Sequence, residues 1–217
     1  VLFDGGLNLR FPGETIKSIV LRISSIRLII SLVAGLLAAH WFAGLGWSVA
    51  GIYSAIVLAT GPTVVTPLVR QIRLASPLSD VLEAEGLILE PIGAVLALLL
   101  LELVVGDLHG WRELFLGLLS RLGGGVLLGS IAGLLLSEGL KRLRSEPYVG
   151  IRLQLTLGVI FLLYGVCEWL LPESGLPASV AAGFVVGQRP STEANELDKL
   201  IRELAQLAIT MLFPLLA

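Results

Sequence analysis

Two glutamates, Glu85 and Glu90, stand inside an apolar run that is long enough to cross a membrane. The run extends from about Val81 to Val105, and Pro91 directly follows the second glutamate. A charged side chain near the middle of a bilayer costs roughly 2.5–3.5 kcal/mol even on the lenient scale derived from insertion experiments. A carboxylate in such a place is expected to be functional or to be hidden inside the protein. We therefore predict that Glu90 carries the chemistry of this chain.

The two glutamates are expected to have different roles. Glu90 lies about 4–5 Å from the centre of the predicted span, whereas Glu85 lies about 140° round the helix and roughly 7–8 Å nearer the inner side. Desolvation disfavours the charged form of a carboxyl group, so Glu90 can hold a proton or a hard monovalent cation but not readily both. That competition is sufficient for antiport. Glu85 is expected to form a structural charge pair with an arginine or lysine of another helix.

A second irregular stretch interrupts the preceding apolar run, about Trp47–Val69, near its middle. Proline lacks the N–H of a helical residue and clashes with the preceding turn, so the prolines here and in the next run are expected to break their helices. Half-helix ends and freed carbonyls at the membrane midplane can bind ions. A simple proline kink, with the threonines bonded to their own backbone, is the alternative. The predicted ligands beside Glu90 are Thr60, Gly61 and Thr63, and the predicted helix-breaking residues are Pro62, Pro67 and Pro91.

The composition predicts an all-α fold, a polytopic bundle of membrane helices. Of the 217 residues, 55% are hydrophobic and only 15% are charged, whereas a soluble domain carries about 25% charged residues. The single cysteine, Cys167, excludes an internal disulfide. We find no metal-ligand cluster, nucleophile elbow or phosphate-binding glycine loop. We therefore expect neither an enzyme nor a cofactor, and no nucleic-acid partner.

Hydropathy and charge together predict seven spans. Thirteen of the fifteen basic residues fall in four alternate connections, as the positive-inside rule requires, and the four tryptophans fall at the opposite interface. Residues 1–25 are expected to be a helix end, a glycine-rich turn and a basic connection. The predicted spans are Ile26–Phe42, Trp47–Val69, Val81–Val105, Glu113–Leu136, Gly150–Leu171, Gly175–Gly187 and a last one that begins near Leu204.

The paired stretches resemble a known family. Leu58–Leu68, which contains Thr60-Gly61-Pro62-Thr63, and Glu85–Ala94 are together similar to the core of the NhaP-type sodium/proton antiporters of the monovalent cation:proton antiporter family. Phe3–Asn8 and Gly175–Gly183 are also similar to that family, so the resemblance covers nearly the whole chain. It implies twelve or thirteen spans in two inverted repeats, crossed discontinuous helices, a homodimer and alternating access.

The resemblance also implies roles for single residues. Glu90 matches the ion-binding position, where many members have aspartate, and Leu89 stands where many have asparagine or isoleucine. Gly61 stands where many members have aspartate. By the same match, Glu85 is expected to pair with a cation on a later helix.

We therefore expect residues 1–217 to be a partial transmembrane antiporter domain, with about six complete spans and truncated ends, from a longer protein in the bacterial cytoplasmic (inner) membrane. The predicted function is exchange of Na+ or K+ for H+ by competition at Glu90, which would also be the monovalent cation site. Two alternatives remain. One is a channel-like K+ efflux system under regulatory control, and the other is a relative that senses ions without transporting them.

Overall fold

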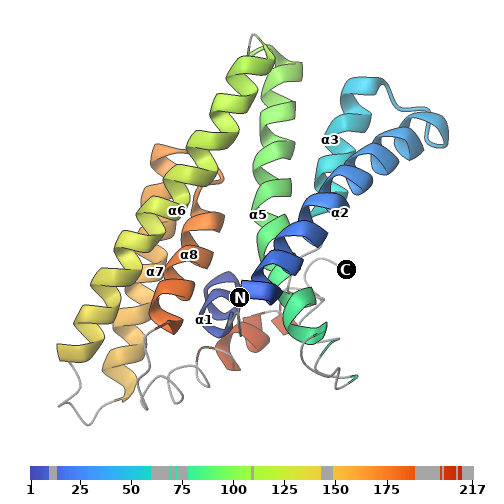
Figure 1. Cartoon of the computed structure of the whole chain (residues 1–217). Helices are drawn as coiled ribbons and strands as arrows, with labels where there is room; N and C mark the ends of the chain where they lie inside the picture. The colour runs from blue at the N-terminus through green and yellow to red at the C-terminus, as the bar shows by residue number, and fades with distance from the viewer. Residues whose placement is uncertain are drawn as a thin grey trace. The chain divides into compact units, whose positions relative to one another are not determined.

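The computed structural model describes residues 1–9, 14–59, 69, 72, 78–108, 110–142, 149–188, 201, 203–208 and 210–211. Within these residues every regular element is a helix (Figure 1). The helices are α1 (Leu2–Asn8), α2 (Glu14–Trp41), α3 (Trp47–Leu58), α5 (Leu78–Val105), α6 (Trp111–Arg142), α7 (Val149–Leu170) and α8 (Gly175–Gly187). Residues 203–208 and 210–211 are also helical.

Among the described residues, four segments are long and apolar enough to cross a membrane, namely Ser18–Ala43, Leu78–Val105, Trp111–Arg142 and Gly150–Leu170. The apolar helices α3 and α8 are shorter, with 12 and 13 residues. Large apolar side chains on α2, α3, α5, α6 and α7 remain exposed, as expected where a helix faces lipid rather than a protein core. The predicted all-α, polytopic architecture is therefore confirmed.

The beginning of the chain differs from the prediction. The expected glycine turn is part of α1, because Gly5, Gly6 and Asn8 are all helical. The side chain of Asn8 bonds back along this helix, donating from Nδ2 to the carbonyl oxygen of Asp4 at 2.9 Å and to its Oδ1 at 3.1 Å. Residues 14–25, predicted as a basic connection, form the first turns of α2. In α1, tertiary packing of the glycines outweighs their low helix propensity.

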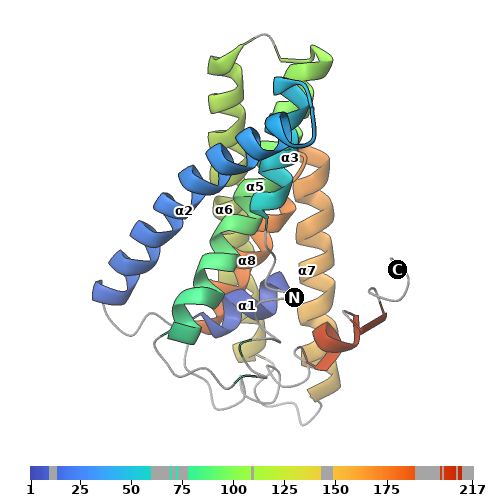
Figure 2. The same cartoon turned by 90° about the vertical axis from the view of Figure 1, so that its right-hand side faces the viewer.

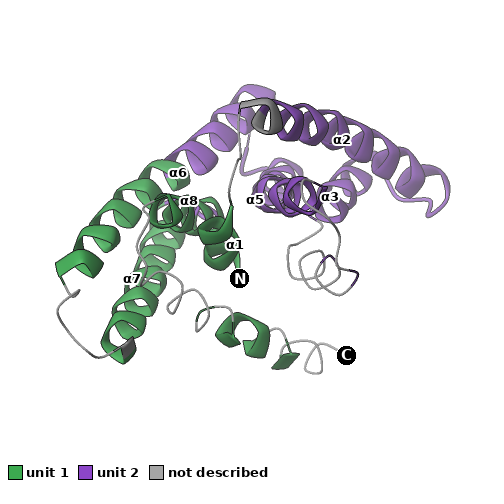
Figure 3. Ribbon diagram, turned by 60° about the horizontal axis from the view of Figure 1, so that its bottom comes forward, with its two compact units in different colours: residues 1–10, 125–170, 175–217 green, residues 11–124, 171–174 purple. Residues whose placement is uncertain are grey.

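The chain forms two compact units, shown separately in colour in Figure 3. Unit 1 comprises residues 1–10, 125–170 and 175–217, and its central element is α8, which packs against α1 and α7. Glycines permit the contact between α1 and α8. A Cβ on Gly183 would clash with the carbonyl oxygen of Phe3, and one on Gly6 would clash with that of Val180. The backbones of the two helices therefore touch directly, as in other membrane helix pairs with small residues at the interface.

The glycines of α6 at four-residue spacing make a similar contact within unit 1. Gly129 lies against the backbone of Ala178, and Gly133 lies against that of Ala182, so α6 reaches α8 at backbone distance. The core beside this contact contains Leu136, Cys167 and both alanines.

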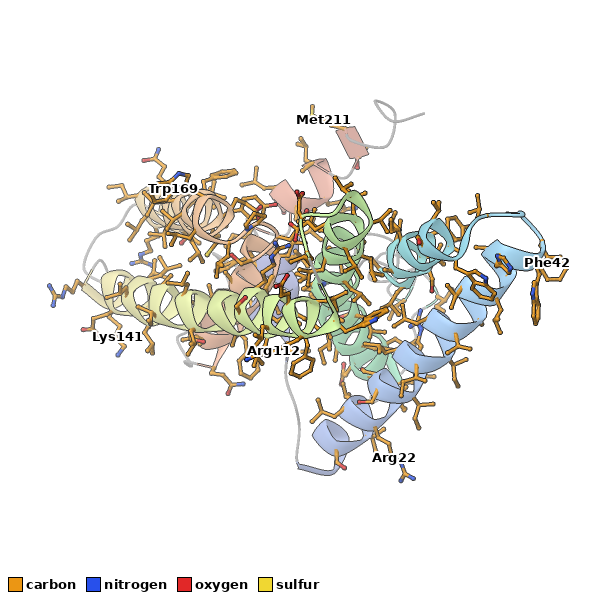
Figure 4. All side chains as sticks on the ribbon, turned by 90° about the horizontal axis from the view of Figure 1, so that it is seen from above. Arg22, Phe42, Arg112, Lys141, Trp169 and Met211 are labelled. Carbon is orange, nitrogen blue, oxygen red and sulfur yellow. The ribbon has the colours of Figure 1, made fainter. Side chains whose placement is uncertain are left out.

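Unit 2 comprises residues 11–124 and 171–174, with α2, α3 and α5 in mutual contact. The helices α2 and α3 form a hairpin (Figure 2). The ring of His40 stacks on Trp47 with centroids 3.8 Å apart, and its Nδ1 lies 2.7 Å from the carbonyl oxygen of Leu45. Figure 4 shows Phe42 at the turn of this hairpin, pointing away from the helices. The hairpin therefore holds the start of α3 at a fixed place against α2.

Candidate functional site

Glu85 and Glu90 both lie on α5, which is one helix from Leu78 to Val105. Its midpoint falls between Pro91 and Ile92, so Glu90 is about 2 Å from the middle of the helix at 1.5 Å per residue. The predicted break at Pro91 is wrong, because the helix continues through it. Proline removes one helical hydrogen bond, and membrane helices tolerate this loss when neighbouring groups or local adjustment compensate for it.

The end of α3 lies against α5 one turn from Glu90. A Cβ added to Gly93 would lie 3.0 Å from the carbonyl oxygen of Ala55 and from both the backbone nitrogen and the Cβ of Ala59. Gly93 follows Glu90 by three residues and therefore lies on the same side of α5. A glycine at this position lets the last turn of α3 touch the backbone of α5 next to the glutamate.

The helix α3 is too short to cross a membrane by itself. Its 12 residues span about 18 Å at 1.5 Å per residue, compared with roughly 30 Å for a bilayer core. The chain leaves the helix at Ala59, whose N–H bonds to the carbonyl of Ile56 at 3.2 Å. The final carbonyls of a helix lack intrahelical partners and carry the negative end of its dipole. This end favours a nearby cation.

The helix therefore ends directly before the predicted irregular stretch. The predicted ligands and helix-breaking residues of that stretch, Thr60, Gly61, Pro62, Thr63 and Pro67, lie outside the described residues.

The carboxylate of Glu90 is partly withdrawn from solvent. Its Oε2 is buried and accepts no hydrogen bond within the described part of the chain. Its neighbours Leu87 and Leu89 are 2% and 0% exposed, so an apolar environment surrounds this turn of α5. A buried oxygen without a donor is unfavourable unless a proton or a cation occupies it. The geometry is therefore suited to a group that exchanges one cationic ligand for another.

Glu85 is paired, and its partner comes from an earlier helix. Nη1 of Arg27 on α2 lies 3.1 Å from Oε2 of Glu85. The Glu85 side chain is 4% exposed and that of Arg27 is 39% exposed. The ion pair matches the structural role expected for this glutamate, but the structure places the cation on α2 rather than on a later helix. Arg27 falls within the predicted first span, Ile26–Phe42, and in the structure it lies inside α2.

Sequence reasoning missed a second ion pair between helices. Arg121 Nη2 on α6 donates to Glu102 Oε1 at 2.8 Å and to Oε2 at 2.9 Å. The available signal was an acid, Glu102, near the end of one predicted span and a single basic residue, Arg121, in the next.

The described residues contain no group of three or more histidine, cysteine, aspartate or glutamate side chains that could hold a metal ion.

Comparison with known proteins assigns the chain to a family. The family model described as the transmembrane domain of sodium/hydrogen exchangers matches residues 1–217, the whole of this chain. No curated protein matches the chain. Since the match extends over every helix described above, the chain belongs to the sodium/hydrogen exchanger family of membrane proteins.

Proposed function

We propose that this protein exchanges a monovalent cation, Na+ or K+, for H+ across a membrane, and that both species compete for Glu90. Membership in the exchanger family supports cation:proton antiport in general. The observation that carries the assignment to Glu90 is the contact of Ala59 with Gly93, which brings the end of α3 to the same side of α5 as the glutamate.

The chemistry follows from this contact. An ionised Glu90 beside the negative end of the α3 dipole attracts one positive charge. A dehydrated Na+ or K+ needs several further oxygens, and the end of α3, with its carbonyls, lies on this side of α5. In the proposal the side chains of Thr60 and Thr63 and the backbone near Gly61 complete the shell. Protonation of Glu90 removes the negative charge and releases the cation, so each turnover couples the two ions.

The proposal includes alternating access, in which the loaded site opens to one side of the membrane at a time. It also includes a homodimer in a bacterial cytoplasmic membrane. The support for these three parts is the family resemblance carried by the two core stretches. Alternating access explains how one carboxylate can release the cation on one side and take up a proton on the other.

The test uses the intact protein in everted vesicles, with a pH-sensitive dye that reports proton efflux after Na+ or K+ is added. Wild type and Glu90→Asp are expected to give cation-dependent dequenching, and Glu90→Gln is expected to give none, because an amide cannot exchange a proton for a cation. A matched control is Glu138→Gln, since Glu138 pairs with Lys141 on an exposed face of α6. It should retain the wild-type rate.

Three results would overturn the proposal. Cation-dependent proton flux at the wild-type rate in Glu90→Gln would exclude this residue as the exchange site. Cation flux without counter-movement of protons would indicate a channel-like K+ pathway. Saturable cation binding by wild type without any flux would indicate an ion-sensing relative.

A further inference from the structure

The ion pair between Glu102 and Arg121 has no place in the exchange reaction described above. Both carboxylate oxygens of Glu102 accept from the same guanidinium nitrogen, at 2.8 and 2.9 Å. The Arg121 side chain is 12% exposed and that of Glu102 is 21% exposed. Twelve residues separate Glu102 from Glu90, which corresponds to about 18 Å along α5. The pair therefore cannot touch an ion held at Glu90.

The pair continues a tight contact between α5 and the first half of α6. A Cβ on Gly117 would lie 2.7 Å from Cδ2 of Leu99, so the two helices are close at this level. Glu102 follows Leu99 by three residues and Arg121 follows Gly117 by four, which places each charge on the same face as the contact. Helical side chains lean toward the N-terminus of their helix. The helices α5 and α6 run antiparallel (Figure 1). The lean of helical side chains therefore directs Arg121 toward the level of Glu102.

Burying these charges between two helices is costly. The helices around them contribute Leu103, Leu118 and Leu122, which pack on the apolar cluster of Val95, Leu99 and Leu114. Nη1 of Arg121 is buried and makes no hydrogen bond within the described part of the chain. Buried ion pairs are a weak source of stability compared with apolar residues of similar volume, although they can fix a unique arrangement. An apolar pair would hold the hairpin together at lower cost, but it would not fix the rotation of one helix against the other.

We propose that Glu102 and Arg121 are positioning residues that fix the rotation of α5 against α6 and thereby the placement of Glu90. Side chains lie roughly 5–6 Å from a helix axis, so a 20° rotation of α5 moves the Glu90 carboxylate by about 2 Å. A change of that size alters ion coordination. Arg121 suits this role because one of its nitrogens, Nη2, reaches both carboxylate oxygens of Glu102, a contact that the ammonium of a lysine can also make.

The test compares Glu102→Gln, Arg121→Gln, the double variant and Arg121→Lys in proteoliposomes, with rates expressed per folded protein. The kinetic part rests on the proposed antiport. Each single neutral variant is expected to raise the apparent KM for the cation at least threefold, because α5 loses its fixed rotation. Arg121→Lys keeps the charge and should restore the KM to within about twofold of wild type. The surface pair variant Glu138→Gln/Lys141→Gln is the matched control and should leave the KM unchanged.

A second measurement separates the failure of this proposal from the failure of the proposed function. Thermal unfolding of the purified variants gives a double-mutant cycle that needs no transport. We expect the two single changes to lower the Tm by more in sum than the double variant does. Additive Tm changes would overturn the ion pair even if wild type showed no exchange. Coupled Tm changes with an unchanged KM would reduce it to a stabilising contact. If the neutral single variants do not fold, Arg121→Lys provides the test. A KM raised at least threefold in that variant would equally overturn the positioning role.

Discussion

Nη1 of Arg27 lies 3.1 Å from Oε2 of Glu85, and the two side chains are unequally buried. The carboxylate is 4% exposed, whereas the guanidinium is 39% exposed. The other carboxylate oxygen, Oε1, is buried and accepts no hydrogen bond within the described residues. Glu85 therefore depends on Arg27 more than Arg27 depends on Glu85, because the carboxylate is the more deeply buried of the two groups.

This inequality predicts different effects for the two halves of the pair. Arg27→Gln leaves an ionised carboxylate buried without its cation and should cost up to roughly 3–5 kcal/mol. Glu85→Gln leaves a half-exposed arginine and should cost less, about 1 kcal/mol. Thermal unfolding of the purified intact protein in detergent measures both. Equal losses, or a larger loss in Glu85→Gln, would show that the pair is not buried as the structure has it.

Gly93 should be the most sensitive glycine near the site. A methyl group in Gly93→Ala would lie 3.0 Å from the backbone of α3, so it should push the end of that helix away and cost about 1–3 kcal/mol through overpacking. The apparent affinity for the cation should fall, since the α3 carbonyls move away from Glu90. Gly158→Ala is the control, because nothing lies within 4 Å of its added methyl group. A Gly93→Ala protein with wild-type KM and Tm would contradict the contact.

The crossing of α1 and α8 predicts a pure folding defect. Gly183→Ala places a methyl group against the carbonyl oxygen of Phe3 and 3.0 Å from the nitrogen of Leu7. Neither backbone atom can move without separating the helices, so we expect a loss of roughly 3 kcal/mol or more. The amount of folded protein in the membrane, measured by fluorescence-detected size exclusion, should drop. Gly165→Ala on the open face of α7 should express normally. Equal yields from the two variants would count against the crossing.

The sequence was sufficient to predict the membrane class and the approximate helices because both depend on local composition. Long apolar runs require helices in lipid, and the predicted spans Val81–Val105 and Gly175–Gly187 agree closely with α5 and α8. The end of α3 at Leu58 also lies just before the predicted irregular stretch. The position of Glu90 near the middle of its helix follows from counting residues along one regular element.

The ion pairs could not be predicted in the same way, because they depend on which faces of different helices meet. Counting charges along the sequence cannot show that Arg27, a basic residue at the start of a span, reaches an acid on another helix. The pairing of Glu102 with Arg121 was missed for the same reason. The helix through Gly5 and Gly6 was missed because backbone contact with α8 supplies what glycine propensity lacks.

Competition at one carboxylate predicts a defined pH dependence of transport. As the pH falls, a larger fraction of Glu90 is protonated, so a higher cation concentration is needed to occupy the site. The apparent KM for Na+ or K+ should therefore rise tenfold per pH unit at the acidic limit, which is the behaviour of one proton competing with one cation. Initial rates in proteoliposomes at several pH values measure it. A KM that stays constant over two acidic pH units would show that the two ions bind independently.

The most direct test is proton release by the purified intact protein when the cation binds, recorded in weakly buffered solution with a pH indicator. Wild type should release protons in a saturable manner as Na+ or K+ is added, because the cation displaces the proton from Glu90. Glu90→Gln should release none, while Glu138→Gln should match wild type. Proton release of wild-type size from a folded Glu90→Gln protein would contradict exchange at this glutamate.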